Sequence, residues 1–139
     1  MNIHVERAKA RRKFSEAFSE INKNLNKENA GFHIKFGSHI IDRTLERGIQ
    51  LSDIFGLLNK LYQAKESILD YCKLPDMPIE NPDPNIEYKP TRLEITDGKL
   101  WIGFTSSEGT KGTYGLTCRM VIFNPSRLPS KISTKVIKF

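Results

Sequence analysis

The sequence predicts an α+β fold in which N-terminal helices pack on one face of a four-stranded antiparallel sheet. Apolar residues recur at helical spacing in the first half, prolines gather in residues 74–90, and alternating strand patterns fill the remainder. A chain of 139 residues has the length of one domain. We therefore expect a single domain over residues 1–139, with a helical region (residues 1–73), a proline-rich connector (residues 74–90) and a β region (residues 91–139).

Three helices are expected in the helical region. The first covers residues 5–27, the second begins at a capping Ser38 and ends before Gly48, and the third covers residues 52–72. Between the first two, residues 32–36 fit either a short strand or an extended linker. The core-facing stripes of the first and third helices comprise Phe14, Ala17, Phe18, Ile21, Leu25, Ile54, Leu57, Leu58, Leu61, Ile68 and Cys72.

The β region contains four predicted strands. The Asp97-Gly98 pair predicts a hairpin turn between the first two, and the Ser-, Gly- and Thr-rich residues 106–115 predict a mobile loop after the second. The expected strands are residues 92–96, 100–105, 116–123 and 133–139.

Alternation along these strands assigns their residues to two faces. One face is aliphatic and includes Cys118, Met120 and Ile122 from the third strand. Because cations hold phosphates and rings stack on bases, the opposite face is typical of single-stranded RNA binding. The alternative is that its rings are core beneath a helix or loop. This opposite face collects Arg92, Lys99, Trp101, Arg119 and Phe123.

The charge distribution also favours a polyanionic partner. The formal net charge is +6, residues 7–13 hold five basic residues and no acid, and no acid follows Glu108. Lys131 and Lys135 belong to this basic C-terminal segment and join Arg92, Lys99, Trp101 and Arg119 as predicted RNA-binding residues. The alternative is a solvated basic surface that only aids solubility.

Several classes of protein are disfavoured. The sequence has no nucleotide-binding glycine motif and no clustered His/Cys set, so no cofactor and no metal are expected. It has no apolar run of membrane-spanning length and no secretory leader, so no membrane association and a cytoplasmic location are expected. Cys72 and Cys118 fall inside helix and strand patterns, as small core residues do.

One stretch has the residue types for metal-free RNA cleavage. His39, Arg43 and Arg47 are four residues apart and lie on one stripe of the second helix. RNA supplies its own nucleophile, the 2′-hydroxyl, so an enzyme needs a base such as His39 and a phosphate ligand such as Arg43. The leaving 5′-oxygen needs a proton, for which His33, a lysine or water are candidates. Arg47 faces either solvent or Glu46.

Three long blocks resemble the RegB family of bacteriophage endoribonucleases. They are F-H-I-K-F-G-S-H-I-I-D-R, Y-K-P-T-R-L-E-I-T-D-G-K-L-W-I-G-F-T and C-R-M-V-I-F-N-P-S-R-L-P-S-K-I-S-T-K-V-I-K. The resemblance implies a fold like that of RelE-type messenger-RNA interferases. It also implies metal-independent cutting of early phage messages in purine-rich G-G-A-G-type Shine–Dalgarno sites, which leaves 2′,3′-cyclic phosphate and 5′-hydroxyl ends. Such enzymes are stimulated by the large RNA-binding protein of the small ribosomal subunit.

The resemblance also assigns site residues. The family's motif histidine and arginine fall on His39 and Arg43, and the histidine of its preceding strand falls on His33. A second active-site histidine of the family falls on Asn59, which cannot shuttle a proton. A non-catalytic RNA-binding regulator on the same fold is therefore the alternative, and a toxin of a toxin–antitoxin pair is a third hypothesis.

Overall fold

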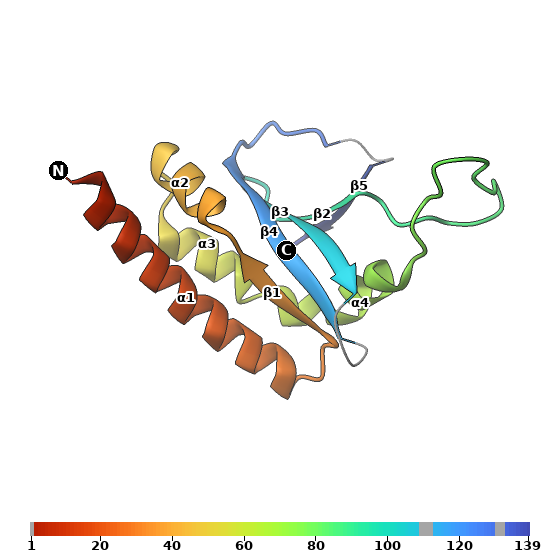
Figure 1. The fold of residues 1–139 in the computed structure, drawn as a ribbon, viewed down its shortest axis with the longest axis horizontal. Helices are drawn as coiled ribbons and strands as arrows, with labels where there is room; N and C mark the ends of the chain where they lie inside the picture. Colours follow the sequence, from red (N-terminus) through yellow and green to blue (C-terminus); the bar gives the residue numbers. More distant parts are fainter. Residues whose placement is uncertain (1, 109–112, 130–132) are drawn as a thin grey trace.

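The computed structural model describes residues 2–108, 113–129 and 133–139. The N-terminal half is helical except for β1, whereas strands alone follow the proline-rich connector (Figure 1). The elements are α1 (Ile3–Lys27), β1 (Phe32–Phe36), α2 (Ser38–Glu46), α3 (Leu51–Leu58), a 3₁₀ helix η1 (Leu61–Ala64), α4 (Lys65–Lys73), β2 (Arg92–Thr96), β3 (Leu100–Glu108), β4 (Tyr114–Phe123) and β5 (Thr134–Lys138).

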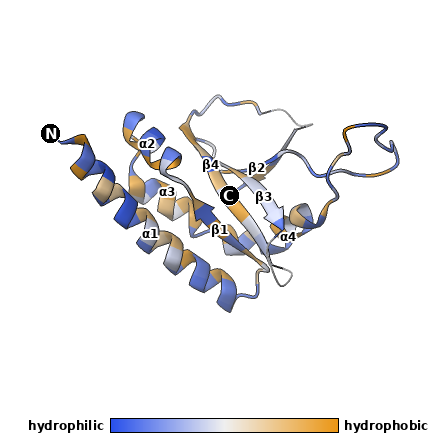
Figure 2. Cartoon of the chain, viewed as in Figure 1, coloured by the Kyte–Doolittle hydropathy of each residue, from blue (hydrophilic) through white to orange (hydrophobic). Residues whose placement is uncertain are grey.

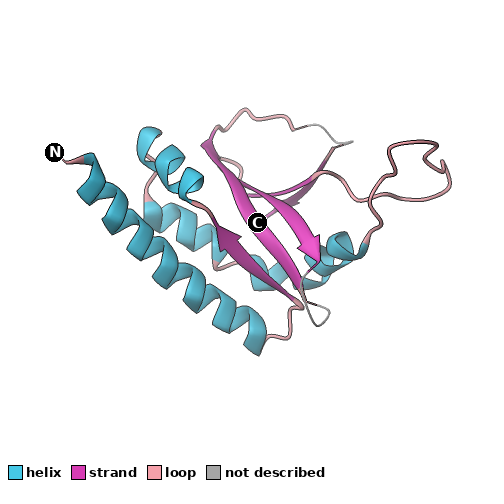
Figure 3. Cartoon of the chain, in the orientation of Figure 1, coloured by secondary structure: helices cyan, strands magenta, loops and turns pink. Residues whose placement is uncertain are grey.

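The strands form one five-stranded mixed sheet in the order β1-β4-β3-β2-β5 (Figure 3). The β2–β3 and β3–β4 pairs are antiparallel, whereas β1 pairs with β4 and β5 pairs with β2 in parallel. The predicted α+β class is confirmed, but the prediction of four antiparallel strands is wrong in number and in direction. The five alternating residues 32–36 fit a strand and a linker equally well, and they form a strand because they pair with the distant β4.

The helices cover one face of the sheet, as predicted. Fully buried residues of the helices, such as Phe14 and Ile68, join fully buried strand residues, such as Ile95 and Phe104, in one core. Hydrophobic and hydrophilic segments alternate along α1, as expected for a helix with one buried stripe (Figure 2). Four of the five predicted stripe residues of α1 are buried, and Ala17 is half-buried.

The predicted third helix is broken into α3, η1 and α4. The Asn59 amide donates to the Phe55 carbonyl at 2.9 Å, and this local bond closes the last turn of α3. All six residues of its predicted core-facing stripe are still buried. Lys65, at the start of α4, donates to the Glu28 carbonyl at the end of α1 at 2.8 Å. The hydrophobic pattern thus predicted correctly which residues are buried, but it wrongly predicted one continuous helix.

Two further boundaries differ from the sequence-based expectation. Gly37, not Ser38, is the N-cap of α2, and no side chain caps this helix. The predicted loop 106–115 is shorter, because β3 continues to Glu108 and β4 begins at Tyr114; residues 109–112 lie outside the described residues.

A β-bulge in β4 inverts the predicted faces of that strand. Gly103 is opposite Met120, and Phe104 is opposite Cys118, so Arg119 is an extra residue in the ladder. After the bulge, Val121 is buried beside Ile102 in the core. The prediction that Met120 and Ile122 share the aliphatic face with Cys118 is therefore wrong. The alternating pattern of a single strand does not reveal a bulge, because the extra residue is defined only by pairing with the neighbouring strand.

The second face of the sheet, opposite the helices, is covered near Trp101 by the residues that follow β4. The Trp101 Nε1 donates to the Asn124 carbonyl at 2.9 Å, and the ring is 7% exposed. The Arg127 guanidinium lies 5.9 Å from the centre of that ring and donates twice to Glu94, each time at 2.9 Å. The prediction that Trp101 offers its ring to RNA is therefore wrong, because a loop buries it.

Candidate active site

The His39–Arg43 pair lies on the exposed side of α2. Ile40, Ile41 and Thr44 are buried on the other side of the helix, which fixes the rotation of α2 against the core. The Arg43 Nε donates to the His39 Nε2 at 3.3 Å, as the four-residue spacing predicts. The His39 Nε2 is the acceptor in this hydrogen bond, so its lone pair is turned toward Arg43.

An aromatic cluster holds the strand–helix junction that carries His39. The Phe36 ring at the end of β1 lies 5.3 Å from the Phe14 ring and 4.8 Å from the Phe18 ring of α1. Phe14 also meets Phe55 of α3 edge-on at 5.3 Å. Helices α1 and α3 therefore pack around the point where β1 ends, and this packing fixes the start of α2.

The acidic side chains of α2 pair with arginines. Arg7 of α1 bonds to Asp42 at 2.7 Å, and Arg43 lies 3.6 Å from Glu46 on an exposed surface. Exposed pairs of this kind contribute about 0–1 kcal/mol, so Arg43 can leave Glu46 for a phosphate at little cost. Arg47 does not pair with Glu46 but donates to the Val121 carbonyl at 2.6 Å.

Arg119 lies beside the same junction. In the parallel β1–β4 pair, Phe36 is opposite Cys118, so the next residues, Gly37 and Arg119, are neighbours. The bulge leaves the Arg119 side chain on the second face, where its Nε donates to the Thr105 hydroxyl at 3.0 Å. The structure thus brings Arg119 to the end of β1 from which α2 and His39 continue.

His33 lies away from His39. Residues 34–38 separate them, and the chain is extended as far as Gly37, so the Cα atoms of His33 and Ser38 are roughly 16 Å apart. Burial, aided by the charge of Lys35, lowers the pKa of His33. A neutral imidazole at this distance cannot protonate an oxygen on the phosphate that His39 contacts, so the structure does not bring the two histidines together.

Lys35 is a candidate residue that the sequence interpretation missed. It lies two residues from His33 on the same face, and a methyl group on Gly115 would lie only 2.7 Å from Lys35 Cε. The glycine therefore makes room for this ammonium group, near the Ser107 hydroxyl. The alternation that predicted strand 32–36 already places both side chains on one face.

The remaining predicted RNA-binding residues do not form one surface. Arg92 lies on the second face in a hollow with Arg127, Lys99 lies at the β2–β3 turn, and Lys135 borders a hollow beside α4. The register places Lys135 level with Leu93, on the core side of the sheet. Lys131 lies outside the described residues. The predicted continuous face of cations and rings is therefore wrong.

The two cysteine thiols are not exposed nucleophiles. Both cysteines are buried and free, as predicted, and burial raises the pKa of Cys72 to about 11 and that of Cys118 to about 12. No three His, Cys, Asp or Glu side chains among the described residues lie close enough to share a metal ion. In the same residues, no helix is both long and apolar enough to cross a bilayer.

An exposed imidazole beside guanidinium groups, on a helix-covered sheet, suits a protein that acts on phosphodiesters. Comparison with known proteins shows that it is an endoribonuclease. The chain belongs to the T4 phage endoribonuclease RegB family, whose model matches residues 1–138. It is 36% identical to endoribonuclease RegB of Enterobacteria phage T4 over 98% of this chain and 95% of that protein. The solution structure of phage T4 endoribonuclease RegB matches with a TM-score of 0.66 and 36% identity, over 99% of each chain. The resemblance seen in the sequence is confirmed.

Proposed function

We propose that this endoribonuclease cuts early phage messages within purine-rich G-G-A-G-type sites, without a metal, in the cytoplasm of the infected bacterium. Its products are 2′,3′-cyclic phosphate and 5′-hydroxyl ends, and residues 1–139 act as one domain. The large RNA-binding protein of the small ribosomal subunit is the proposed stimulating partner. Family membership supports this proposal, and the geometry of His39 and Arg43 supports its chemistry.

The observation that carries the mechanism is the 3.3 Å bond between Arg43 Nε and His39 Nε2. This bond is longer than usual for a protein hydrogen bond and lies on an exposed helix face, so it is readily exchanged. When RNA binds, Arg43 turns to a phosphate oxygen, and the Nε2 lone pair accepts the 2′-hydroxyl proton. One side chain thus orients the base at rest and stabilises charge during the reaction.

The reaction is an in-line transfer at phosphorus. His39 takes the 2′-hydroxyl proton while the 2′-oxygen bonds to phosphorus and the bond to the 5′-oxygen breaks. Arg43 and Arg119 hold the non-bridging oxygens, where negative charge increases in the transition state. General-base catalysis by a histidine contributes roughly 10²–10⁴-fold.

The leaving oxygen takes its proton from water in this proposal. His33 is too far from His39, and Asn59 bonds to Phe55 through its own amide. We assign His33 and Lys35 to binding RNA that flanks the cut, together with Arg92 and Lys99. Without a positioned acid, we expect turnover to be slower than in a relative that has the second histidine.

The test is cleavage of an end-labelled RNA with one G-G-A-G site in EDTA. The wild-type protein should make a single cut in the site and leave a cyclic phosphate, while His39→Ala should cut at least 10²-fold more slowly. His4→Ala, at an exposed position on α1, is the matched control and should cut like wild type. Cleavage by His39→Ala at the wild-type rate would remove His39 from the mechanism.

Asn59 specifically favours the alternative function, a non-catalytic RNA-binding regulator. Asparagine can position RNA by hydrogen bonds but cannot exchange a proton with the 5′-oxygen. Binding of the same RNA with no cleavage, even with small ribosomal subunits added, would favour the regulator. Asn59→His should then restore cutting if this position faces the scissile phosphate.

A further inference from the structure

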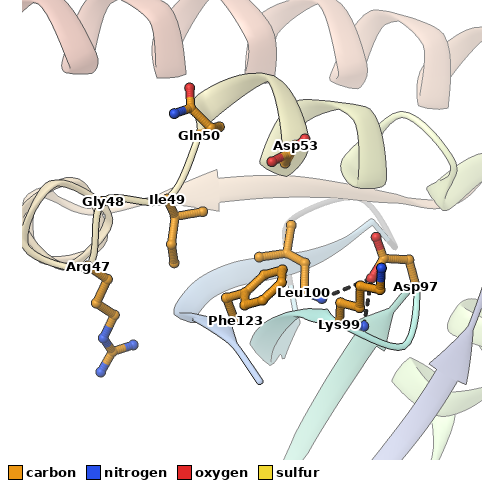
Figure 4. Close-up of a pocket in the computed structure, with 9 residues that line it drawn as sticks. All are labelled: Arg47, Gly48, Ile49, Gln50, Asp53, Asp97, Lys99, Leu100 and Phe123. Atoms are coloured by element: carbon orange, nitrogen blue, oxygen red, sulfur yellow. Dashed lines mark hydrogen bonds between the residues drawn. The ribbon is translucent and has the colours of Figure 1, made fainter. Parts of the chain in front are cut away.

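A cavity of about 470 Å³ lies where the end of α2, the start of α3 and the β2–β3 turn meet (Figure 4). Pockets of this size hold small organic groups. Phe123 and Leu100 lie side by side in it, Asp53 approaches from α3, and Arg47 lies at one side with Lys99 and Asp97 at the other. The chemistry proposed for His39 uses none of these side chains.

Phe123 presents an aromatic surface to this cavity. Its side chain is 61% exposed, although its cross-strand partner Leu100 is only 3% exposed. The bulge at Arg119 puts Phe123 on the core side of the strand, where no residue covers it among those the structure describes. The Asn124 N–H donates to the Lys99 carbonyl at 2.7 Å, which fixes the end of β4 and thereby the ring. Fixed exposed rings of this kind are stacking platforms for bases.

Charges of both signs surround the ring. Arg47 is oriented by its bond to the Val121 carbonyl, and its remaining N–H groups are free to bind another acceptor. Burial alone would raise the pKa of Asp97, but backbone hydrogen bonds from Leu100 and Lys99 lower it, so its carboxylate stays ionised. A site for a simple anion would not contain two carboxylates, and a cation site would not contain Arg47 and Lys99.

A nucleotide has the complementary chemistry. Its base is a flat ring for Phe123, its phosphates are anions for Arg47 and Lys99, and the donors on its edge suit a carboxylate. Guanine is distinguished because its N1–H and N2 amino groups are adjacent donors on one edge, which a carboxylate can accept together. Asp53, in the first turn of α3, is the less constrained of the two carboxylates.

We propose that this cavity binds a guanine base of the RNA substrate, stacked on Phe123 and read by Asp53, with flanking phosphates on Arg47 and Lys99. The inference rests on the proposed function, because it places the recognised base on the same RNA as the cut. Arg47 follows His39 by eight residues on one helix stripe, so the two positions are roughly 12 Å apart along α2. One short RNA segment therefore reaches both.

The experiment measures binding of a fluorescent G-G-A-G RNA to protein that carries His39→Ala, so that the RNA stays intact. Adding Phe123→Ala should weaken binding roughly 5- to 100-fold, the range for loss of one stacked base. Phe123→Tyr keeps the ring and should bind within about twofold. Ile79→Ala, which removes an exposed apolar side chain in the connector, is the matched control.

A set of RNAs, each lacking one base of the site, locates the stacked base. At one guanine position, the RNA that lacks the base should bind the parent protein and its Phe123→Ala variant with equal affinity. Asp53→Asn should likewise remove the preference for guanine over inosine, which lacks the N2 amino group. Equal affinities of Phe123→Ala and its parent for intact RNA, or an equal effect at every position, would overturn the inference.

Cleavage by protein with His39 intact separates this inference from the proposed function. If wild type cuts the site and Phe123→Ala binds and cuts like wild type, the guanine pocket is wrong and the nuclease stands. If no cut occurs while Phe123→Ala still loses affinity at one guanine, the pocket stands and the cleavage proposal fails.

Discussion

At the scale of single residues, the Glu94–Arg127 pair is the most buried ionic interaction among the described residues. Glu94 is 1% exposed, and its carboxylate accepts two hydrogen bonds from Arg127, each 2.9 Å long. These bonds also raise the pKa of Arg127 and hold it against Trp101. The pair thus fastens the segment after β4 onto the second face of the sheet.

We expect Glu94→Gln to destabilise the protein by about 2–3 kcal/mol, because it leaves a guanidinium without its counter-charge. This value is below the usual cost of breaking a buried pair, since the Arg127 side chain is 24% exposed. Urea unfolding measures the loss. Glu20→Gln removes an exposed partner of Lys23 and should change stability by less than about 0.5 kcal/mol; equal losses in the two variants would contradict the buried role.

His33 predicts a pH dependence of stability. Its pKa is below 6.5 in the folded protein because of burial and Lys35, so the unfolded chain binds the proton more tightly. The contribution of His33 to stability is therefore fully present above pH 6.5 and is lost as the pH falls through the lower pKa of the folded protein. His33→Asn should flatten this part of the profile in unfolding measured on both sides of pH 6.5, whereas His4→Asn should not. An unchanged profile in His33→Asn would refute the assignment.

At the scale of elements, replacing a glycine with alanine should change stability in opposite directions at the end of α2 and within α3. Gly48 follows α2 with φ +61°, a conformation that costs a side-chain-bearing residue roughly 1–2 kcal/mol, so Gly48→Ala should destabilise by that amount. Gly56 is within α3 with open space around it, so Gly56→Ala should stabilise by about 0.5–1 kcal/mol. Thermal unfolding distinguishes the two. A Gly48→Ala variant as stable as wild type would show that α2 does not depend on its glycine end, and a destabilised Gly56→Ala variant would contradict the prediction for α3.

The elements themselves could largely be predicted from sequence, because their signals are local. The α1 stripe, the Asp97-Gly98 hairpin and the helical end at Gly48 each depend on residues a few positions apart. The parallel pairing of β1 with β4 could not be predicted, because its partners are separated by about eighty residues and no local pattern encodes them. The bulge at Arg119 could not be predicted for the same reason.

The candidate site was predictable only in part. Helical spacing gives the contact between His39 and Arg43, and the structure shows it. Neither spacing nor alternation places Arg119 beside α2, because that depends on the register of β4 against β1. Trp101 shows the opposite problem: alternation gives its position in the strand correctly, but the loop that covers it follows β4 in the chain.

At the scale of the whole molecule, the predicted RNA-binding residues separate into two sides of the sheet. Arg119→Ala should weaken RNA binding and reduce the slope of log affinity against log salt by about 0.7, the value for one phosphate contact on a single strand. Lys135→Ala should leave the slope unchanged, because Lys135 lies level with Leu93 on the core side, beside α4. A larger change for Lys135 would place the RNA path on the other side of the molecule.

The parallel pairing of β1 with β4 also has a consequence for the timing of synthesis. β1 and α2 leave the ribosome early, yet α2 docks on β4, where Arg47 binds the Val121 carbonyl and Phe36 pairs with Cys118. Until translation has passed residue 123, the helix that carries His39 has no strand to rest on. A nascent chain therefore emerges without an assembled candidate site, because the strand that completes it is translated last of the parts that hold α2.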